Sequence, residues 1–216
     1  MSGFFITFEG PDGSGKSTIL KMVGETLQQK FSNHSILLTR EPGGTNNPIA
    51  EDIRNILLNK IEYKIDYHTE ALLFAASRAQ HVSDFIKPNL EKNAIVLCDR
   101  YIDSSIVYQG YGRKLGVENI LKINEFAMQG VLPNVTFILM VKPEVGLERI
   151  FSNKTREVNR IDKEKGGLHQ MVYDAYRKII DSDKTGRIIE IDASKDLPTV
   201  LEEVLAKLLP KLQQNF

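Results

Sequence analysis

The sequence has very little cysteine and no excess of charge of either sign. Cys98 is the one cysteine among 216 residues, so no disulfide can form within the chain, which fits a reducing compartment such as the cytoplasm. Lysine plus arginine number 28, and so do aspartate plus glutamate. A net charge of zero gives no support for nucleic acid or a membrane as the main partner. Basic groups that bind an anion must therefore be gathered locally.

Long hydrophobic runs are absent as well. No apolar stretch approaches the roughly 20 residues that cross a bilayer. The opening segment has no basic region and is interrupted by Glu9, so it indicates a first strand rather than a signal peptide. Apolar residues make up 42% of the chain and charged residues 26%, as in soluble globular proteins. We therefore expect one domain over residues 1–216, located in the cytoplasm.

Short apolar runs alternate with segments of helical periodicity. Strands are expected at Phe4–Phe8, Ser35–Thr39, Ala94–Cys98, Val135–Val141 and Arg187–Ile191. Helices are expected at Lys16–Lys30, Pro48–Leu58, His68–Leu90, Val117–Met128, Glu144–Ile150, Gly167–Ile180 and Leu197–Leu209. This alternation predicts an α/β fold with a parallel sheet covered by helices on both faces. Ligands in such sheets bind beyond the carboxyl ends of the strands.

A glycine-rich motif follows the first strand and opens the first helix. It matches G-x-x-x-x-G-K-[ST], and with the next residue it comprises Gly10, Pro11, Asp12, Gly13, Ser14, Gly15, Lys16, Ser17 and Thr18. Glycines let successive backbone N–H groups surround a phosphate, and the helix dipole faces the same anion. We expect this segment to bind ATP, with Lys16 on the β- and γ-phosphates and the Ser17 hydroxyl on Mg²⁺.

Asp99 ends the most apolar of the expected strands. An acid in this place commonly holds Mg²⁺ through a water in P-loop enzymes, although an ordinary strand-terminating aspartate gives the same pattern. Further arginines are expected along the same edge of the sheet, at Arg40, Arg54, Arg78, Arg100 and Arg113. A second anionic substrate facing ATP accounts for them, because arginine binds phosphate in a bidentate manner.

The charged segment 149–165 admits two interpretations. Its acids nearly balance its bases, as in a solvated helix–turn stretch, but in a P-loop protein of this size a lid that closes over the substrates is the better interpretation. No Asn-Lys-x-Asp tetrapeptide, which a guanine site needs, is present. A phosphate acceptor needs no general base, because its attacking oxygen is already ionised.

Several motifs in the same order give the chain a resemblance to bacterial thymidylate kinase from Phe8 to about Pro198. They are Phe-Glu-Gly-Pro-Asp-Gly-Ser-Gly-Lys-Ser-Thr from Phe8, Thr-Arg-Glu-Pro-Gly-Gly from Thr39, Leu-Phe-Ala-Ala-Ser-Arg from Leu73, Asp-Arg-Tyr-Ile-Asp-Ser-Ser from Asp99, Tyr-Gln-Gly from Tyr108 and Asn-Arg-Ile-Asp from Asn159. The resemblance implies a P-loop three-layer sandwich with a five-stranded parallel sheet and a short lid. It also implies a homodimer and transfer of the ATP γ-phosphate to dTMP, for dTTP synthesis.

The resemblance further implies how dTMP is recognised. Phe74 would stack on thymine and Arg78 would donate to its O4, where cytosine presents an amino group instead. Without the resemblance, Phe74 is also consistent with a core aromatic. Asp12 would accept from the sugar 3′-OH, and Tyr108 would crowd the 2′ position.

Other positions are assigned in the same way. Ser105 and Gln109 would add contacts near the base, while the dTMP phosphate would be held by Arg40, Arg54 and Arg100. Glu41 would orient these groups or the metal shell, although an acid that only shapes the turn before Pro42 is an equal alternative.

The family neutralises the transition state with a basic residue either in the P-loop or in the lid. Positions 11–14 carry no basic side chain, whereas the lid carries Arg156 and Arg160, so the chain resembles the lid-arginine type. Arg160 is the first choice, although Asn159 stands beside it where the family often has aspartate. The expected catalytic residues are thus Lys16, Arg100, Arg156 and Arg160.

Two rival functions remain open. Another nucleotide or deoxynucleoside kinase could use the same scaffold, and a nucleoside acceptor would need a base such as Glu41, but the surplus of arginines argues against a nucleoside. A non-enzymatic P-loop module that controls a partner is the second rival. The lid and the pair of Phe74 and Arg78 argue against it.

Overall fold

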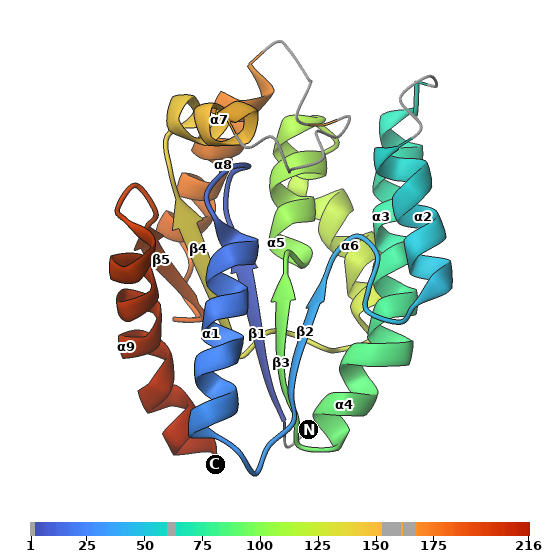
Figure 1. Ribbon diagram of the computed structural model, residues 1–216. Helices are drawn as coiled ribbons and strands as arrows, with labels where there is room; N and C mark the ends of the chain where they lie inside the picture. The colour runs from blue at the N-terminus through green and yellow to red at the C-terminus, as the bar shows by residue number, and fades with distance from the viewer. Residues whose placement is uncertain (1–2, 60–63, 153–160, 162–166) are drawn as a thin grey trace.

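The computed structural model describes residues 3–59, 64–152, 161 and 167–216, and its centre is a twisted parallel sheet (Figure 1). The strands are β1 (Phe4–Glu9), β2 (Ile36–Arg40), β3 (Ile95–Asp99), β4 (Val135–Met140) and β5 (Ile188–Asp192). Their order in the sheet is β2-β3-β1-β4-β5, and every neighbouring pair is parallel. The expected α/β sandwich with a five-stranded sheet is confirmed.

Helices cover both faces of this sheet (Figure 1). The longer ones are α1 (Lys16–Lys30), α2 (Pro48–Leu58), α3 (Tyr67–His81), α6 (Val117–Met128), α7 (Pro143–Ser152), α8 (Leu168–Ser182) and α9 (Leu197–Asn215). The short α-helices are α4 (Lys87–Glu91) and α5 (Ile102–Ser105), and the π-helical segments are η1 (Val82–Ile86) and η2 (Ile106–Gly112). No helix in the described part of the chain is long and apolar enough to cross a membrane.

The central strand β1 shows why both faces are covered. All of its side chains are buried, and alternate ones point to opposite faces. Phe4, Ile6 and Phe8 join the core formed with α1 and α9, while Phe5 packs on the other face against the edge of the Tyr101 ring. Burying one such apolar side chain contributes about 1.5–3 kcal/mol, so a strand with apolar side chains on both faces favours the middle of the sheet.

The strand register gathers the polar ends of β1, β2 and β3 at one edge. Asp99 of β3 lies level with Phe8 of β1 and with Arg40 of β2. Glu9, Arg40 and Asp99 therefore end together, next to the loop that begins at Gly10. The ends of these strands thus lie at one edge of the sheet, as expected for parallel strands.

The helix expected over His68–Leu90 is present, as the consecutive segments α3, η1 and α4. Two other expectations about helices were wrong. Residues 102–112, for which no helix was predicted, form α5 and η2, because their side chains are buried on nearly all sides and so give no apolar stripe. The last helix runs beyond Leu209 and through Pro210. Leu208 and Leu212 remain buried one turn apart there, and their packing outweighs the proline.

Candidate active site

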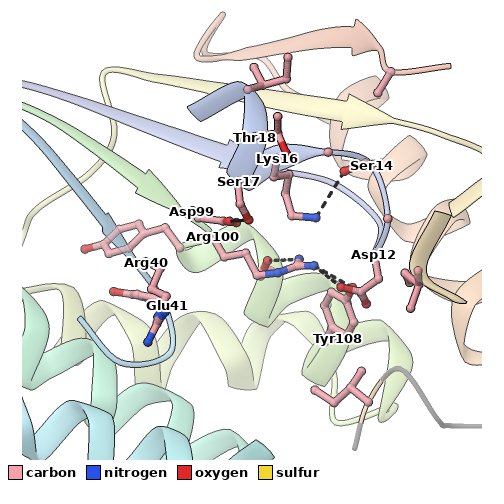
Figure 2. Close-up of a pocket in the computed structure, with 18 of the residues that line it drawn as sticks. Asp12, Ser14, Lys16, Ser17, Thr18, Arg40, Glu41, Asp99, Arg100 and Tyr108 are labelled. Atoms are coloured by element: carbon pink, nitrogen blue, oxygen red, sulfur yellow. Dashed lines mark hydrogen bonds and ion pairs between the residues drawn. The ribbon is translucent and has the colours of Figure 1, made fainter. Parts of the chain in front are cut away.

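A cavity of about 750 Å³ lies beyond the carboxyl ends of β1, β2 and β3 (Figure 2). Its lining includes nearly every residue proposed from the sequence that falls in the described part of the chain. These are Asp12, Gly13, Ser14, Gly15, Lys16, Ser17, Thr18, Arg40, Glu41, Arg54, Phe74, Arg78, Asp99, Arg100, Ser105, Tyr108 and Gln109. Segments far apart in the sequence thus meet around one space, while the role of each residue remains a prediction.

The phosphate-binding loop needs glycine for reasons of space as well as conformation. Gly10 and Gly13 have φ angles of 136° and 78°, which residues with a side chain rarely adopt. A Cβ on Gly10 would lie 2.3 Å from the carbonyl oxygen of Leu139, and one on Gly13 would lie 2.1 Å from that of Gly146. The loop is therefore packed directly against β4 and α7, and its backbone N–H groups are held in place for an anion.

Lys16 begins α1 and folds back over this loop. Its Nζ donates to the carbonyl oxygens of Gly10 and Pro11 at 3.0 and 2.8 Å, and to Ser14 Oγ at 3.3 Å (Figure 2). Burial lowers the pKa of Lys16 to about 8, and repulsion from Arg100 acts in the same direction. The ammonium group is still mostly protonated at neutral pH, so it supplies a positive charge next to the loop.

Ser17 and Asp99 form the part of the cavity that suits a metal ion. The Ser17 hydroxyl donates to Asp99 Oδ2, and both side chains line the cavity (Figure 2). Oxygen ligands of this kind fit Mg²⁺, which usually binds few protein groups and completes its shell with water and substrate phosphates. The described residues contain no group of three or more His, Cys, Asp or Glu side chains that could hold a metal alone. These two residues thus fit Mg²⁺ that arrives with a nucleotide.

Arg100 follows β3 and reaches into the P-loop. Its Nη2 lies 2.7 Å from Asp12 Oδ1, and its Nη1 donates to Ser104 Oγ at 2.9 Å. The guanidinium also lies over the Tyr108 ring, 5.1 Å from its centroid, and the Tyr108 hydroxyl donates to Asp12 Oδ2 at 2.7 Å. Asp12, Arg100 and Tyr108 therefore form one connected group on the cavity wall (Figure 2).

Glu9 supports this group from beneath, although the sequence did not single it out as a site residue. It is fully buried, and its carboxylate accepts from Tyr101 N at 2.7 Å, Ser104 N at 3.2 Å, Ser104 Oγ at 2.5 Å and Tyr176 OH at 2.9 Å. Burial raises the pKa of Glu9 to about 7, with repulsion from Asp103 adding to it. The sequence does carry a signal for Glu9, which is a charged residue at the end of a mostly apolar strand.

Two expected phosphate ligands lie on the side of the cavity formed by α2. Arg40 pairs with Glu51 at 3.1 Å, and about half of its side chain is exposed. Arg54 Nη1 donates to the Pro42 carbonyl oxygen at 2.8 Å. Arg40 is thus paired with a residue of α2 and Arg54 with the loop after β2, and neither side chain is buried.

Arg78 is held more firmly than its expected role in base recognition suggested. Only 2% of it is exposed. Its Nε donates to Glu41 Oε2 at 2.8 Å, its Nη1 to Ser105 Oγ at 3.1 Å and to Asn124 Oδ1, and its Nη2 to the Tyr101 carbonyl oxygen at 3.0 Å. Four of its five N–H groups have partners among the described residues, so Arg78 is rigid at the floor of the cavity.

Arg113 does not lie where the sequence suggested. It was expected at the edge of the sheet with the other arginines, but it is buried and does not line the cavity. Its Nε pairs with Glu70 Oε1 at 2.9 Å, and Gln109 Nε2 donates to the same oxygen at 3.0 Å. The pairing draws Arg113 into the protein, because a buried charge needs an opposite partner.

The lid is only partly described. Arg156 and Arg160, the expected transition-state arginines, lie outside the described residues, as does most of segment 149–165. Arg149 lines the cavity, and its Nη1 donates to the Ala193 carbonyl oxygen at 2.9 Å. Ile161 also lines it. The described ends of the expected lid therefore border the cavity.

Known proteins resemble the chain over nearly its whole length. The family model described as thymidylate kinase matches residues 8–204. A thymidylate kinase from Bacillus pumilus is 44% identical over 215 residues, covering 100% of this chain and 99% of that protein. One from Pediococcus pentosaceus is 47% identical over 208 residues, covering 96% and 98%.

A solved structure agrees with these sequences. The crystal structure of thymidylate kinase from Ehrlichia chaffeensis superposes with a TM-score of 0.75 at 34% identity, covering 95% of this chain and 98% of the other. Sequence, fold and the residues gathered around the cavity agree, and the chain belongs to the thymidylate kinase family.

Proposed function

We propose that the protein transfers the γ-phosphate of ATP to dTMP, giving dTDP and ADP, inside the cavity between the P-loop and α3. The observation that carries this proposal is the meeting, in one cavity, of a P-loop with a second set of cationic side chains, Arg40, Arg54 and Arg100. A volume of about 750 Å³ is within the range of ligand sites in proteins. We take the whole chain as one domain acting in the cytoplasm.

ATP is bound by the P-loop side of the cavity. Its phosphates accept from the backbone N–H groups of residues 13–18 and from Lys16 Nζ. Mg²⁺ would be held by the Ser17 hydroxyl and, through water, by Asp99, and when bound it supplies neutralisation of the phosphate charge. The fixed backbone around Gly10 and Gly13 means that little reorganisation is needed when the anion binds.

The phosphate of dTMP is bound opposite, by Arg100 with help from Arg40 and Arg54. Its attacking oxygen is ionised, so the protein has to bring two anions together rather than remove a proton. Asp12 accepts from the 3′-OH, and the Tyr108 ring occupies the space that a 2′-OH would need. Arg100 and Tyr108 already hold the Asp12 carboxylate in one orientation.

The thymine base lies between Phe74 and Arg78, with Ser105 and Gln109 nearby. Arg78 is fixed by residues of the loop after β2, of α5 and of α6, so its remaining Nη2 proton has a defined direction. A rigid N–H donor forms a hydrogen bond with the O4 acceptor of thymine and cannot form one with the amino group of cytosine, which is itself a donor. The Glu41 carboxylate, which holds Arg78 Nε, orients this donor rather than acting as a base.

Charge that develops on the transferred phosphoryl group is neutralised by an arginine of the lid. We assign this role to Arg160 and a supporting one to Arg156, because the P-loop positions 11–14 carry no basic side chain.

The protein acts as a homodimer. Exposed apolar side chains gather on α2, on α3 and on α6 with the loop after it, and α3 packs against both other helices. They include Ile49, Leu72, Phe126 and Leu132, of which Phe126 is 87% exposed. A second copy that covers this surface removes it from water. In sedimentation velocity, the protein should sediment as a dimer and a Phe126→Glu variant as a monomer; a monomeric parent protein would contradict this part.

Isothermal titration calorimetry with dTMP and thymidine tests the proposed acceptor. The two ligands share base and sugar and differ by the phosphate. We expect dTMP to bind at least about 100-fold more tightly, because two or more charge-assisted hydrogen bonds are lost with thymidine. Equal affinities would assign the site to a nucleoside.

A further inference from the structure

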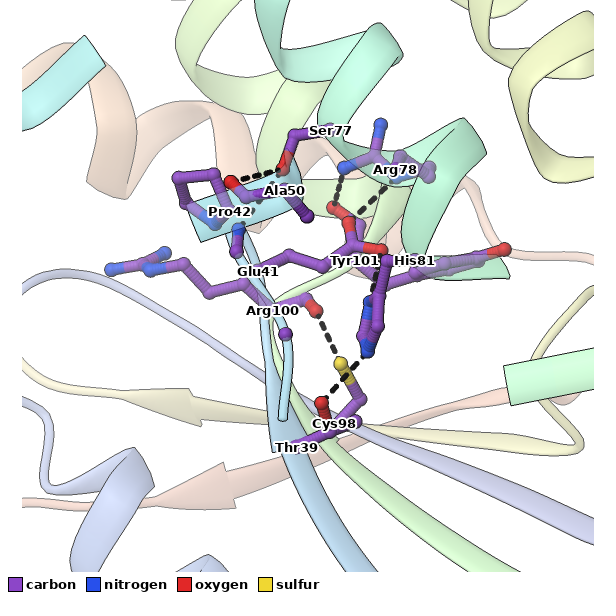
Figure 3. Close-up of polar contacts among 12 residues, drawn as sticks. Thr39, Glu41, Pro42, Ala50, Ser77, Arg78, His81, Cys98, Arg100 and Tyr101 are labelled. Carbon is purple, nitrogen blue, oxygen red and sulfur yellow. Dashed lines mark hydrogen bonds and ion pairs between the residues drawn. The ribbon is translucent and has the colours of Figure 1, made fainter. Parts of the chain in front are cut away.

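His81 lies outside the cavity but connects Thr39, in β2, to Glu41, in the loop that borders the cavity. It occupies the last turn of α3, is fully buried and does not line the cavity. Its Nε2 lies 2.7 Å from Thr39 Oγ1, and its Nδ1 lies 3.1 Å from Glu41 Oε1 (Figure 3). The imidazole ring therefore joins the residue before Arg40 to the residue after it.

The contact with Glu41 defines which atom donates at one end of the ring. A carboxylate oxygen accepts only, so Nδ1 of His81 carries a proton and donates to Glu41. At the other end, Nε2 forms a hydrogen bond with the Thr39 hydroxyl. That hydroxyl in turn accepts from Thr45 N at 3.3 Å. Both ring nitrogens are thus hydrogen-bonded, so the ring acts as a bracket that joins Thr39 to Glu41.

The bracket acts on Arg40 because side chains alternate along an extended backbone. Thr39 and Glu41 point to the buried side, with 6% and 5% exposed, whereas the Arg40 side chain points the other way and is 54% exposed. Fixing the two flanking side chains fixes the direction in which the arginine leaves the strand. The next turn of the loop also rests on this ring, since a Cβ on Gly44 would lie 2.6 Å from His81 Cδ2.

Glu41 extends the same network to the base-recognising side of the cavity. Its Oε1 accepts from His81 and its Oε2 from Arg78, and the two donors lie one helical turn apart on α3 (Figure 3). Removing the imidazole leaves Glu41 hydrogen-bonded to Arg78 but breaks the link from Glu41 through His81 to Thr39 of β2. Arg40 also has a competing partner, because Glu51 lies 3.1 Å away.

We propose that His81 is a positioning residue that holds Thr39 and Glu41 so that Arg40 is directed at the phosphate of dTMP. This inference rests on the proposed function, in which Arg40 binds that phosphate. This role differs from that of an ordinary core residue, because His81 would affect dTMP binding through Arg40. The same bracket gives Glu41 a place in the site that does not require it to contact a metal or a substrate.

A double-mutant cycle tests the proposal. His81→Gln, Arg40→Ala and the combination are compared with the parent protein by steady-state kinetics, and circular dichroism at the assay temperature shows that each is folded. We expect His81→Gln to raise the KM for dTMP about tenfold, with kcat and the KM for ATP changing less than about twofold. In the Arg40→Ala background, His81→Gln should have no further effect.

A second variant keeps the proposal testable if His81→Gln does not fold. Thr39→Val removes the hydroxyl at nearly constant volume, and we expect the same selective increase in the KM for dTMP and the same dependence on Arg40. Gln80→Ala, one residue away on α3, is the matched control. Additive effects in the cycle, or an equal change in all kinetic constants, would overturn the positioning role. An unchanged KM for dTMP in Arg40→Ala alone would instead refute the proposed phosphate contact.

Discussion

Arg100 Nη2 lies 2.7 Å from Asp12 Oδ1, which links the residue after β3 directly to the interior of the P-loop. Arg100 has a positive φ of 71°, and its guanidinium also donates to Gly10 O at 3.2 Å and to Tyr176 OH at 3.3 Å. The P-loop and Arg100, which is expected to bind the acceptor phosphate, therefore form one hydrogen-bonded unit.

Arg100→Lys should impair this unit although it keeps the charge. One ammonium group cannot reproduce a planar fork that contacts Asp12, Ser104 and Gly10 together. We expect kcat/KM for dTMP to fall by about 100-fold or more in a coupled assay. A variant within threefold of the parent protein would show that a point charge is enough.

Lys16→Ala should nearly abolish turnover. The Nζ group is held above the P-loop by Gly10, Pro11 and Ser14, and no other residue of that loop has a basic side chain. We expect kcat to fall by about 10³-fold or more. Lys21→Ala, an exposed lysine on the same helix, should leave kcat unchanged. Turnover that survives in Lys16→Ala would remove this lysine from the chemistry.

Phe74→Ala should weaken dTMP binding while ATP binding is preserved. Phe74 lines the cavity from α3, one turn before Arg78, and truncation removes the surface on which we propose that the base stacks. Stacking on an aromatic side chain contributes about 1–3 kcal/mol, so the dissociation constant should rise by about 5- to 150-fold. Calorimetry with dTMP, and with an ATP analogue as control, measures both. An unaltered dTMP affinity would place the base elsewhere.

Arg160→Ala tests the lid. We expect kcat to fall about 100-fold or more with little change in the KM for dTMP, since the arginine would act on charge present only in the transition state. Arg156→Ala, the neighbouring lid arginine, is the comparison, and its effect should be smaller. The reverse order would exchange the two roles, and unchanged kcat in both would exclude a lid arginine.

Glu9→Gln should change how stability depends on pH. The pKa of Glu9 is about 7 in the folded protein and about 4.5 ordinarily, chiefly because of burial. The folded state thus binds more protons than the unfolded chain between these pH values, so the contribution of Glu9 to the free energy of unfolding is lost as pH rises from 4.5 through 7. In urea titrations, the free energy of unfolding of the variant should rise relative to that of the parent protein by on the order of 1–3 kcal/mol over this range. A constant difference would contradict the raised pKa.

The strands and the P-loop could be predicted because their signals are local. An apolar run such as Val96–Cys98 ending at Asp99, or a glycine-rich loop before Lys16, needs no knowledge of distant residues. Residues 102–112 lack such a local signal, because their side chains are buried on nearly all sides and show no apolar stripe that would predict α5 and η2. The bracket formed by His81 depends on how α3 packs over β2, so it joins residues about 40 positions apart that no spacing rule connects.

The acceptor preference of the enzyme tests the central claim most directly. In one coupled assay, ADP release from ATP is measured with dTMP, dUMP, dCMP, dGMP and thymidine as acceptors. The account predicts that dTMP has the highest kcat/KM, at least about 100-fold above dCMP and dGMP, with no turnover of thymidine. Equal use of dCMP would contradict base recognition by Arg78, and turnover of thymidine would contradict a phosphate acceptor.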